Sequence, residues 1–291
     1  MLEKIRRIYK YVRYGIPVIE KKQVFANIST LSKNELLKGR TSLITGGTNG
    51  IGYEIAKEFL KAGAVVIITG RNRERLNNAI NSLKNDVPES EVLAFQLDNG
   101  NVEQISKSIP SILETFKLSK IDILVNNAGI NSGPKGCTYE ENFDAILNTN
   151  LKGTFFLAKT FAEYLKQHGI EGNILNIASS SSDRPATDAY TLSKWGIKGL
   201  TKGLARVYTS YGIVVNGIAP GPTATSMIKG DNKDGNLAHE KSLTGRLAHP
   251  SEIATMAVIL VSNISRMVIG DIIYMSGGAG NVYNEDVNYK F

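Results

Sequence analysis

Seven short apolar runs alternate with amphipathic segments between residues 41 and 276, and this alternation constrains the fold more than any other feature of the chain. The runs are residues 41–45, 64–69, 91–97, 121–127, 172–178, 213–219 and 271–276. The segments between them, at about 50–62, 73–84, 101–117, 139–167, 188–210 and 251–262, have the apolar spacing of helices. Strands that alternate with helices of crossover length form a parallel sheet covered on both faces. We therefore predict an α/β fold with one doubly wound domain around a seven-stranded parallel sheet.

The composition excludes several classes of protein. The chain is 42% hydrophobic and 21% charged, which is the balance of an ordinary globular protein. Its one cysteine, Cys137, cannot form an internal disulfide, and its three histidines are scattered, so no metal site is expected. No apolar run reaches the roughly 18 to 20 residues of a membrane span, and the charged start lacks the apolar stretch of a signal peptide. We expect a cytoplasmic protein.

The net charge of +7 comes from one end of the chain. Residues 1–40 contain ten Lys or Arg and three acidic residues, whereas residues 41–291 contain 24 of each sign. The basic character therefore belongs to the N-terminal segment and not to the predicted domain. For this reason we do not expect nucleic-acid binding.

Residues 1–38 form a basic extension before the predicted domain, which we place at 39–281, followed by a C-terminal tail at 282–291. Apolar residues recur in the extension at 3- and 4-residue spacing, as in an amphipathic helix that ends near Gly15 and Pro17. They are Leu2, Ile5, Tyr9, Val12 and Ile16. One interpretation is that this helix packs on its own domain or on a sister subunit. The alternative is that residues 1–16 dock on an anionic membrane surface or on an acidic partner.

A glycine-rich turn, Thr45-Gly46-Gly47-Thr48-Asn49-Gly50-Ile51-Gly52, joins the first predicted strand to the first helix. Glycines let a backbone turn sharply and approach phosphates, and the helix N-terminus presents free N–H groups to negative charge. The spacing is G-x-x-x-G-x-G and differs from the G-x-G-x-x-G of most dinucleotide-binding folds. The turn predicts a pyrophosphate site; the alternative is a tight turn with close helix–sheet packing.

The end of the second strand indicates which nicotinamide cofactor is bound. A cofactor without the 2′-phosphate usually meets a carboxylate here, whereas this chain has Arg71 and no acid before Glu74. A guanidinium suits a 2′-phosphate. We therefore favour NADP(H) over NAD(H), the alternative being that Arg71 and Arg73 are only the solvated start of a helix.

A candidate catalytic group follows the fifth strand, where Ser179 lies eleven residues before Tyr190 and Lys194 lies four residues after it. Positions i and i+4 share one face of a helix, so the phenol and the ammonium can project into the same cleft. A fixed positive charge lowers the pKa of a phenol toward a value useful in acid–base catalysis. A serine at the end of the neighbouring strand can hydrogen-bond the same substrate oxygen.

Together these segments resemble the short-chain dehydrogenase/reductase family over about residues 39–280. The motifs are TGGTNGIG at 45–52, NNAG at 126–129, NTNLKG at 148–153, the serine strand, YTLSK at 190–194 and APGPTAT at 219–225. The resemblance implies a Rossmann-type fold, a nicotinamide cofactor and assembly as a homodimer or homotetramer. The family more often places its serine further before the tyrosine than Ser179 is, so Ser180 is kept as the alternative.

The resemblance also implies roles for individual residues. Tyr190 would be the acid or base on the carbonyl oxygen, Lys194 would hold the nicotinamide ribose and lower the pKa of Tyr190, and Ser179 would orient the carbonyl. Asn150 would hold a water that links Lys194 to solvent. Besides Arg71, Tyr190 and Lys194, the implied cofactor contacts are Gly46, Thr48, Asn49, Gly50, Ile51, Gly52, Asp98, Asn126, Ala128, Gly129, Pro220, Gly221 and Thr225.

The candidate lid, at about 223–248, contains few apolar residues among many charges and glycines. Sites for steroids or long acyl chains are mostly apolar, so we expect a small polar substrate, with Arg184 or Lys135 as candidate anion ligands. The predicted function is an NADP(H)-dependent oxidoreductase that interconverts a carbonyl and a secondary alcohol. The alternatives are an NAD-dependent alcohol or sugar dehydrogenase and a non-catalytic nucleotide-binding scaffold or sensor.

Overall fold

The computed structural model describes residues 33–225, 236–240 and 242–279. The predicted helix within residues 1–16, the tail at 282–291, and residues 226–235 and 241 of the candidate lid lie outside the described residues. In the described ranges the chain forms one seven-stranded parallel sheet, as predicted. The strands are β1 (Thr41–Thr45), β2 (Val65–Gly70), β3 (Val92–Gln96), β4 (Ile123–Asn126), β5 (Gly172–Ile177), β6 (Ile213–Pro220) and β7 (Ile272–Met275).

The strand order is β3-β2-β1-β4-β5-β6-β7, so the chain winds outward from β1 in one direction and then from β4 in the other. Leu43 of β1 pairs in parallel register with Ile67 of β2 on one side and with Leu124 of β4 on the other. The connections that leave β1 and β4 at their carboxyl ends therefore diverge, and a crevice opens between them. This is the place where an open α/β sheet binds a ligand.

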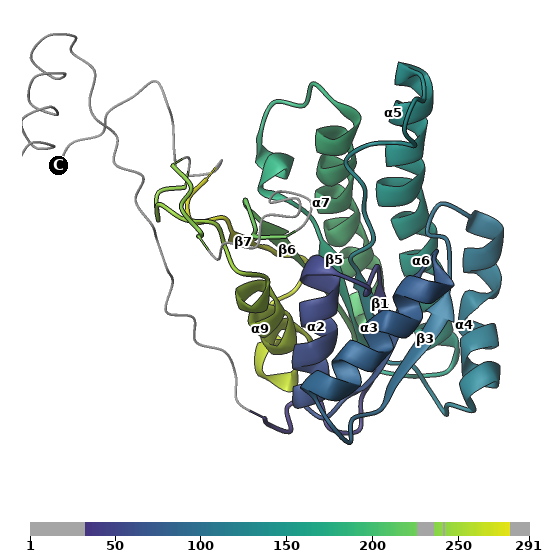
Figure 1. The fold of residues 1–291 in the computed structure, drawn as a ribbon. Helices are drawn as coiled ribbons and strands as arrows, with labels where there is room; N and C mark the ends of the chain where they lie inside the picture. The colour runs from purple at the N-terminus through teal and green to yellow at the C-terminus, as the bar shows by residue number, and fades with distance from the viewer. Residues whose placement is uncertain (1–32, 226–235, 241, 280–291) are drawn as a thin grey trace, which may run out of the picture.

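Two layers of helices cover the sheet (Figure 1). Helices α2 (Gly50–Lys61), α3 (Arg73–Asp86) and α9 (Pro250–Val261) pack on one face, and α4 (Val102–Phe116), α6 (Gly153–Gln167) and α7 (Ala189–Tyr208) pack on the other. The strands are apolar on both faces because both are buried: Ile44 and Ile68 pack toward α2 and α9, and Leu43 and Ile67 pack toward α4 and α6. Within the described ranges, no helix combines the length and the apolar character needed to cross a membrane.

The long helical stretch predicted at about 139–167 is confirmed, and the structure adds a π-helical turn in its middle. The structure has α5 (Tyr139–Leu147), a π-helical turn at Asn148–Lys152 and then α6. The backbone stays helical throughout, so the apolar pattern continues. The sequence pattern therefore does not reveal the π-helical turn. The turn contains Asn150, whose side chain hydrogen-bonds both the N–H and the C=O of Ile130 at 2.8 Å. Such turns insert one residue into a helix and are frequent at functional sites.

Gly153, the first residue of α6, allows that helix to approach the segment that follows β3. A Cβ atom at this position would overlap the carbonyl oxygen of Asn99, a residue that is itself buried. We expect Gly153→Ala to lower the free energy of unfolding by about 3 kcal/mol, because backbone must move to admit the methyl group. Gly203→Ala is the matched control: it lies in α7 with no atom within 4 Å of the added Cβ. That substitution should raise stability by about 1 kcal/mol. Urea denaturation measures both, and equal stability of the two variants would contradict the packing argument.

Candidate active site

A cavity of about 770 Å³ lies at the carboxyl ends of the strands, in the crevice beside β1 and β4. Most of the predicted site residues line it. These are Gly46, Thr48, Asn49, Gly50, Ile51, Arg71, Asp98, Ala128, Gly129, Ser179, Tyr190, Lys194, Pro220, Gly221 and Thr225. Three predicted residues, Gly52, Asn126 and Asn150, do not line the cavity. The structure thus brings together residues that are up to 179 positions apart in the chain.

The glycine-rich turn fits a dinucleotide pyrophosphate. Gly46 and Gly50 have φ values of +66° and +56°, a left-handed region that favours glycine. Asn49, the N-cap of α2, makes no capping hydrogen bond with its side chain, and the first turn of α2 contains no acidic residue. Backbone N–H groups at the start of α2 are therefore available to an anion in the cavity. Gly52 serves packing instead, since a Cβ there would lie 2.5 Å from the carbonyl oxygen of Gly46.

Two arginines line the cavity beyond the end of β2. Arg71 lies at the position expected from the sequence, and Arg75 joins it from the first turn of α3, whereas Arg73 does not line the cavity. Asn72 caps α3 by accepting a hydrogen bond from the Arg75 N–H at 2.9 Å, which fixes the start of the helix between the two arginines. The sequence analysis did not single out Arg75, whose place at the cavity depends on where α3 begins. Two exposed guanidinium groups at one end of the cavity favour an anionic ligand group there.

Ser179, Tyr190 and Lys194 meet at the other end of the cavity. Ser179 follows β5, and Tyr190 and Lys194 lie one turn apart on α7, with the Lys194 Nζ 5.6 Å from the centroid of the Tyr190 ring. The Ser179 hydroxyl hydrogen-bonds the Tyr190 side chain. Ser180, the alternative serine, is buried and does not line the cavity. Of the two serines, only Ser179 lines the cavity.

Burial dominates the electrostatics of this group. It raises the pKa of Tyr190 above its usual 10, a shift that the hydrogen bond with Ser179 opposes and the charge of Asp188 reinforces. Burial also lowers the pKa of Lys194 to about 8. The Lys194 ammonium lies over the Tyr190 ring and donates a 2.8 Å hydrogen bond to the Ile177 carbonyl. That Lys194 lowers the pKa of Tyr190 stays a prediction from the sequence.

The two predicted asparagines that miss the cavity hold its walls in place. Asn150 is buried in the π-helical turn and hydrogen-bonds Ile130, which lines the cavity, and Ser193 of α7 at 3.3 Å. Asn126 donates to Asn176 of β5 at 2.9 Å. The neighbouring Asn127, which sequence reasoning did not single out, lines the cavity and donates to the carbonyl oxygens of Thr45 and Gly46 at 2.9 and 3.1 Å.

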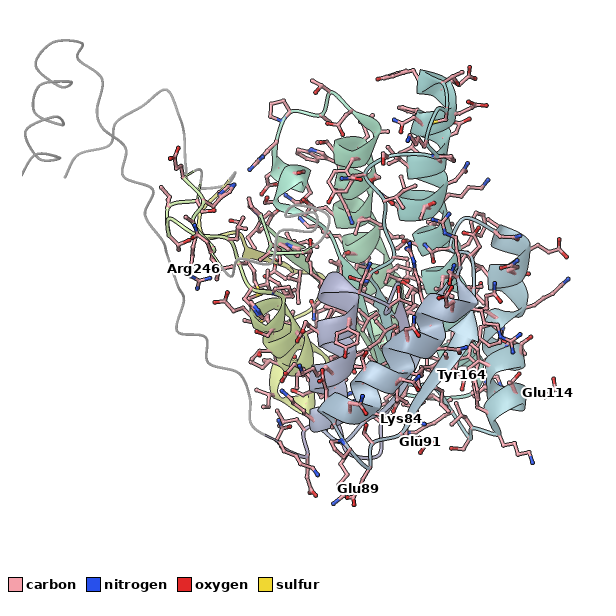
Figure 2. The ribbon with its side chains drawn as sticks, in the orientation of Figure 1. Lys84, Glu89, Glu91, Glu114, Tyr164 and Arg246 are labelled. Atoms are coloured by element: carbon pink, nitrogen blue, oxygen red, sulfur yellow. The ribbon has the colours of Figure 1, made fainter. Side chains whose placement is uncertain are left out.

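The described part of the candidate lid is fastened to the domain. Arg246, which is labelled in Figure 2, lies beside the amino end of α9. It forms a two-pronged ion pair with Glu252 of α9, with both N–O distances at 2.8 Å. The Ala224 N–H donates to the Ala248 carbonyl at 2.9 Å, so the two ends of the segment meet. Arg184 and Lys135, the candidate anion ligands, do not line the cavity. Among the residues that the structure describes, no three His, Cys, Asp or Glu side chains come together in a way that could hold a metal ion.

The depressed pKa of Lys194 makes stability depend on pH. Below pH 8 the lysine is charged in both the folded and the unfolded chain, and folding bears the full cost of burying the charge. Between pH 8 and about 10.4 only the unfolded chain stays protonated, so this cost disappears as the pH rises. We expect Lys194→Met to be about 2 kcal/mol more stable than the wild type at pH 7, with the difference shrinking toward pH 10.5. Chemical denaturation at several pH values measures it, and a constant difference would contradict the assignment.

Comparison with known proteins identifies the family. The short chain dehydrogenase model matches residues 40–236. The chain is 33% identical over 252 residues to a 3alpha-hydroxysteroid dehydrogenase of Mediterraneibacter gnavus, covering 84% of this chain and 98% of that protein. It is 32% identical to a gluconate 5-dehydrogenase of Gluconobacter oxydans, covering 83% and 95%.

A solved structure agrees with these sequence relatives. A short chain dehydrogenase from Burkholderia cenocepacia in complex with NADP superimposes with a TM-score of 0.72 at 28% identity, over 84% of this chain and 98% of that one. The relatives are named dehydrogenases, and the strands, the cavity and the motifs agree with the same assignment. The chain therefore belongs to the short-chain dehydrogenase/reductase family, whose members are oxidoreductases that act on alcohol and ketone groups.

Proposed function

We propose that this protein is an NADP(H)-dependent oxidoreductase that interconverts a ketone and a secondary alcohol on a small polar substrate, with Tyr190 as the acid and base. The observation that carries the proposal is one cavity with the glycine-rich turn and two arginines at one end and Ser179, Tyr190 and Lys194 at the other. A dinucleotide that spans these ends places its reactive ring beside the tyrosine.

Each side chain has a defined task in this proposal. When bound, the nicotinamide supplies or accepts the hydride. Tyr190 gives its phenolic proton to the carbonyl oxygen in reduction, and the Ser179 hydroxyl donates a hydrogen bond to the same oxygen as negative charge develops there. Lys194, with a pKa of about 8, exchanges protons close to neutral pH and offers its ammonium to the cofactor ribose.

Two observations support the choice of NADP(H). Arg71 and Arg75 line the cavity beyond the end of β2, and a guanidinium suits a 2′-phosphate. The related short chain dehydrogenase from Burkholderia cenocepacia is in complex with NADP in its solved structure.

A polar substrate is supported by several polar side chains of the cavity. Asn131, Ser132 and Thr223 line the same cavity and offer amide and hydroxyl groups to substrate oxygens. The relatives are named for both kinds of substrate, a hydroxysteroid and gluconate, and the polar lining favours the second kind. Against the scaffold alternative stands the presence of all three reactive side chains on one cavity wall, which a protein that only binds a nucleotide does not need.

Assembly and location are part of the proposal. Phe155 and Phe156 of α6 and Trp195 of α7 expose large apolar surface, which supports a homodimer or homotetramer. A cytoplasmic location, and docking of residues 1–16 on a membrane or a partner, stay predictions from the sequence, because residues 1–16 lie outside the described residues.

Tyr190→Phe tests the chemistry. The substrates are 5-keto-gluconate and a 3-ketosteroid, the ketones that correspond to the names of the two relatives. We expect NADPH-dependent reduction of the polar ketone by the wild type and a loss of about 1,000-fold in kcat in Tyr190→Phe, with NADPH binding retained. Tyr139→Phe, on an exposed tyrosine of α5, is the control and should have wild-type kcat. A wild type that binds cofactor and reduces neither ketone would favour the sensor.

Arg71→Ala tests the choice of cofactor. If Arg71 contacts a 2′-phosphate, removing the guanidinium should raise the Kd for NADPH about 30-fold and change the Kd for NADH less than about twofold, as measured by fluorescence titration. Arg73→Ala is the matched control, because Arg73 is as exposed as Arg71 and does not line the cavity. Equal effects of Arg71→Ala on the two cofactors would instead support an NAD-dependent dehydrogenase.

A further inference from the structure

We propose that Lys198 is a positioning residue, which holds the loop between Ser179 and Tyr190 against α7 and so keeps Ser179 in place. The inference rests on the proposed roles of Ser179 and Tyr190 in ketone reduction. Lys198 does not line the cavity, and it lies one helical turn beyond Lys194 on the same face of α7. It acts through other residues and not on the substrate.

The Lys198 side chain is held from three sides. Its ammonium forms an ion pair with Asp183 and lies 5.5 Å from the ring centroid of Trp195 and 5.6 Å from that of Tyr274. A cation between two aromatic rings and a carboxylate has a restricted set of positions. Consistent with this, the hydrogen bond with Asp183 raises the pKa of Lys198. The contact therefore joins α7 and β7 to the last residue of the turn that follows Ser179.

From Asp183 the connection runs back to Ser179. Residues Ser180–Asp183 form a 3₁₀ turn, and the Ser179 hydroxyl caps this turn by accepting from the Ser181 N–H at 3.1 Å. The Ser182 hydroxyl donates to the Ser179 carbonyl at 2.7 Å and lies 3.3 Å from the Tyr274 hydroxyl. Ser182 is completely buried. Two of the three polar groups of Ser179, its hydroxyl and its carbonyl, are thus hydrogen-bonded to the turn that Lys198 holds.

The rest of the loop is fastened to α7 as well. The Trp195 ring N–H donates to the Arg184 carbonyl at 2.8 Å, and Asp188 caps the start of α7 by accepting from the Thr191 N–H at 2.8 Å. These contacts hold the loop at its middle and at its end. Lys198 and Tyr274 hold its beginning, which is the part next to Ser179.

The exposure of the ion pair indicates how much it contributes to the stability of the fold. The Lys198 and Asp183 side chains are 24% and 28% exposed, and a partly exposed ion pair contributes little to overall stability because solvent screens it. Catalysis is more sensitive, because a displacement of about 1 Å in a reacting group can cost roughly 100-fold in rate. The proposal therefore predicts a large effect of Lys198 on turnover and a small effect on unfolding.

The test compares Lys198→Met, Lys198→Arg and Tyr274→Phe in the full chain. In Lys198→Met we expect kcat for the reduced ketone to fall about tenfold, while the KM for NADPH changes less than twofold, because the cofactor contacts lie elsewhere. Hydrogen exchange at residues 180–188 should become about tenfold faster, with exchange in the sheet unchanged. Lys198→Arg keeps the charge and should restore both readouts to within threefold. Tyr274→Phe removes the hydroxyl near Ser182 and should give an intermediate loss.

Lys107→Met is the matched control, because it breaks an exposed ion pair with Glu103 on α4. It should change neither readout. Wild-type kcat and wild-type exchange in Lys198→Met would overturn the proposal, and so would equal losses in Lys198→Met and Lys198→Arg. If Lys198→Met fails to fold, Lys198→Arg and Tyr274→Phe decide by the same two readouts. If the wild type reduces no ketone, the proposed function fails, and the exchange rates alone decide whether Lys198 holds the loop.

Discussion

The reversal of strand order between β1 and β4 is the constraint on which the rest of the structure depends. Two diverging connections leave the carboxyl ends of neighbouring strands uncovered, and the cavity occupies that gap. The opposite ends of the strands are tied together by Asp122, which accepts from the Thr41 N–H at 2.9 Å and from the Arg40 side chain at 2.6 Å. Arg40 also donates to Asn173 of β5 at 2.9 Å. The amino edge is thus fixed by charge-assisted hydrogen bonds, and the carboxyl edge is left for function.

The burial of the Lys194 ammonium lowers the stability of the folded chain. Lys194 is 5% exposed and has no carboxylate partner among the described residues; its ammonium donates to one backbone carbonyl, that of Ile177. A buried amine without a counter-charge lowers its own pKa, which agrees with the value of about 8. A core position occupied for stability alone would favour an apolar side chain. The unfavourable burial of this charge is consistent with an ammonium that binds a ligand.

The sequence predicts the fold well because the evidence for the fold is repeated along the chain. All seven strands lie where the apolar runs are, and the parallel order follows from helices of crossover length. The site was predicted less completely because its details depend on side-chain direction. Arg75 was missed because only its place at the start of α3 turns it toward the cavity, and Asn150 reaches Ile130 through a π-helical turn that leaves no trace in the apolar period. The pKa of Tyr190 is raised mainly by burial, which sequence spacing does not report.

Helix α7 explains how one rigid element can organise both the chemistry and its support. Tyr190, Lys194 and Lys198 follow each other at intervals of four, so they occupy successive turns of one face. The first two line the cavity, and the third holds the turn that carries Ser179. Because all three side chains are fixed to the same helix, a movement of α7 carries the tyrosine, the lysine and the serine loop together. Their relative positions are then set by a helix of 20 residues and not by the loop of ten residues that joins Ser179 to Tyr190.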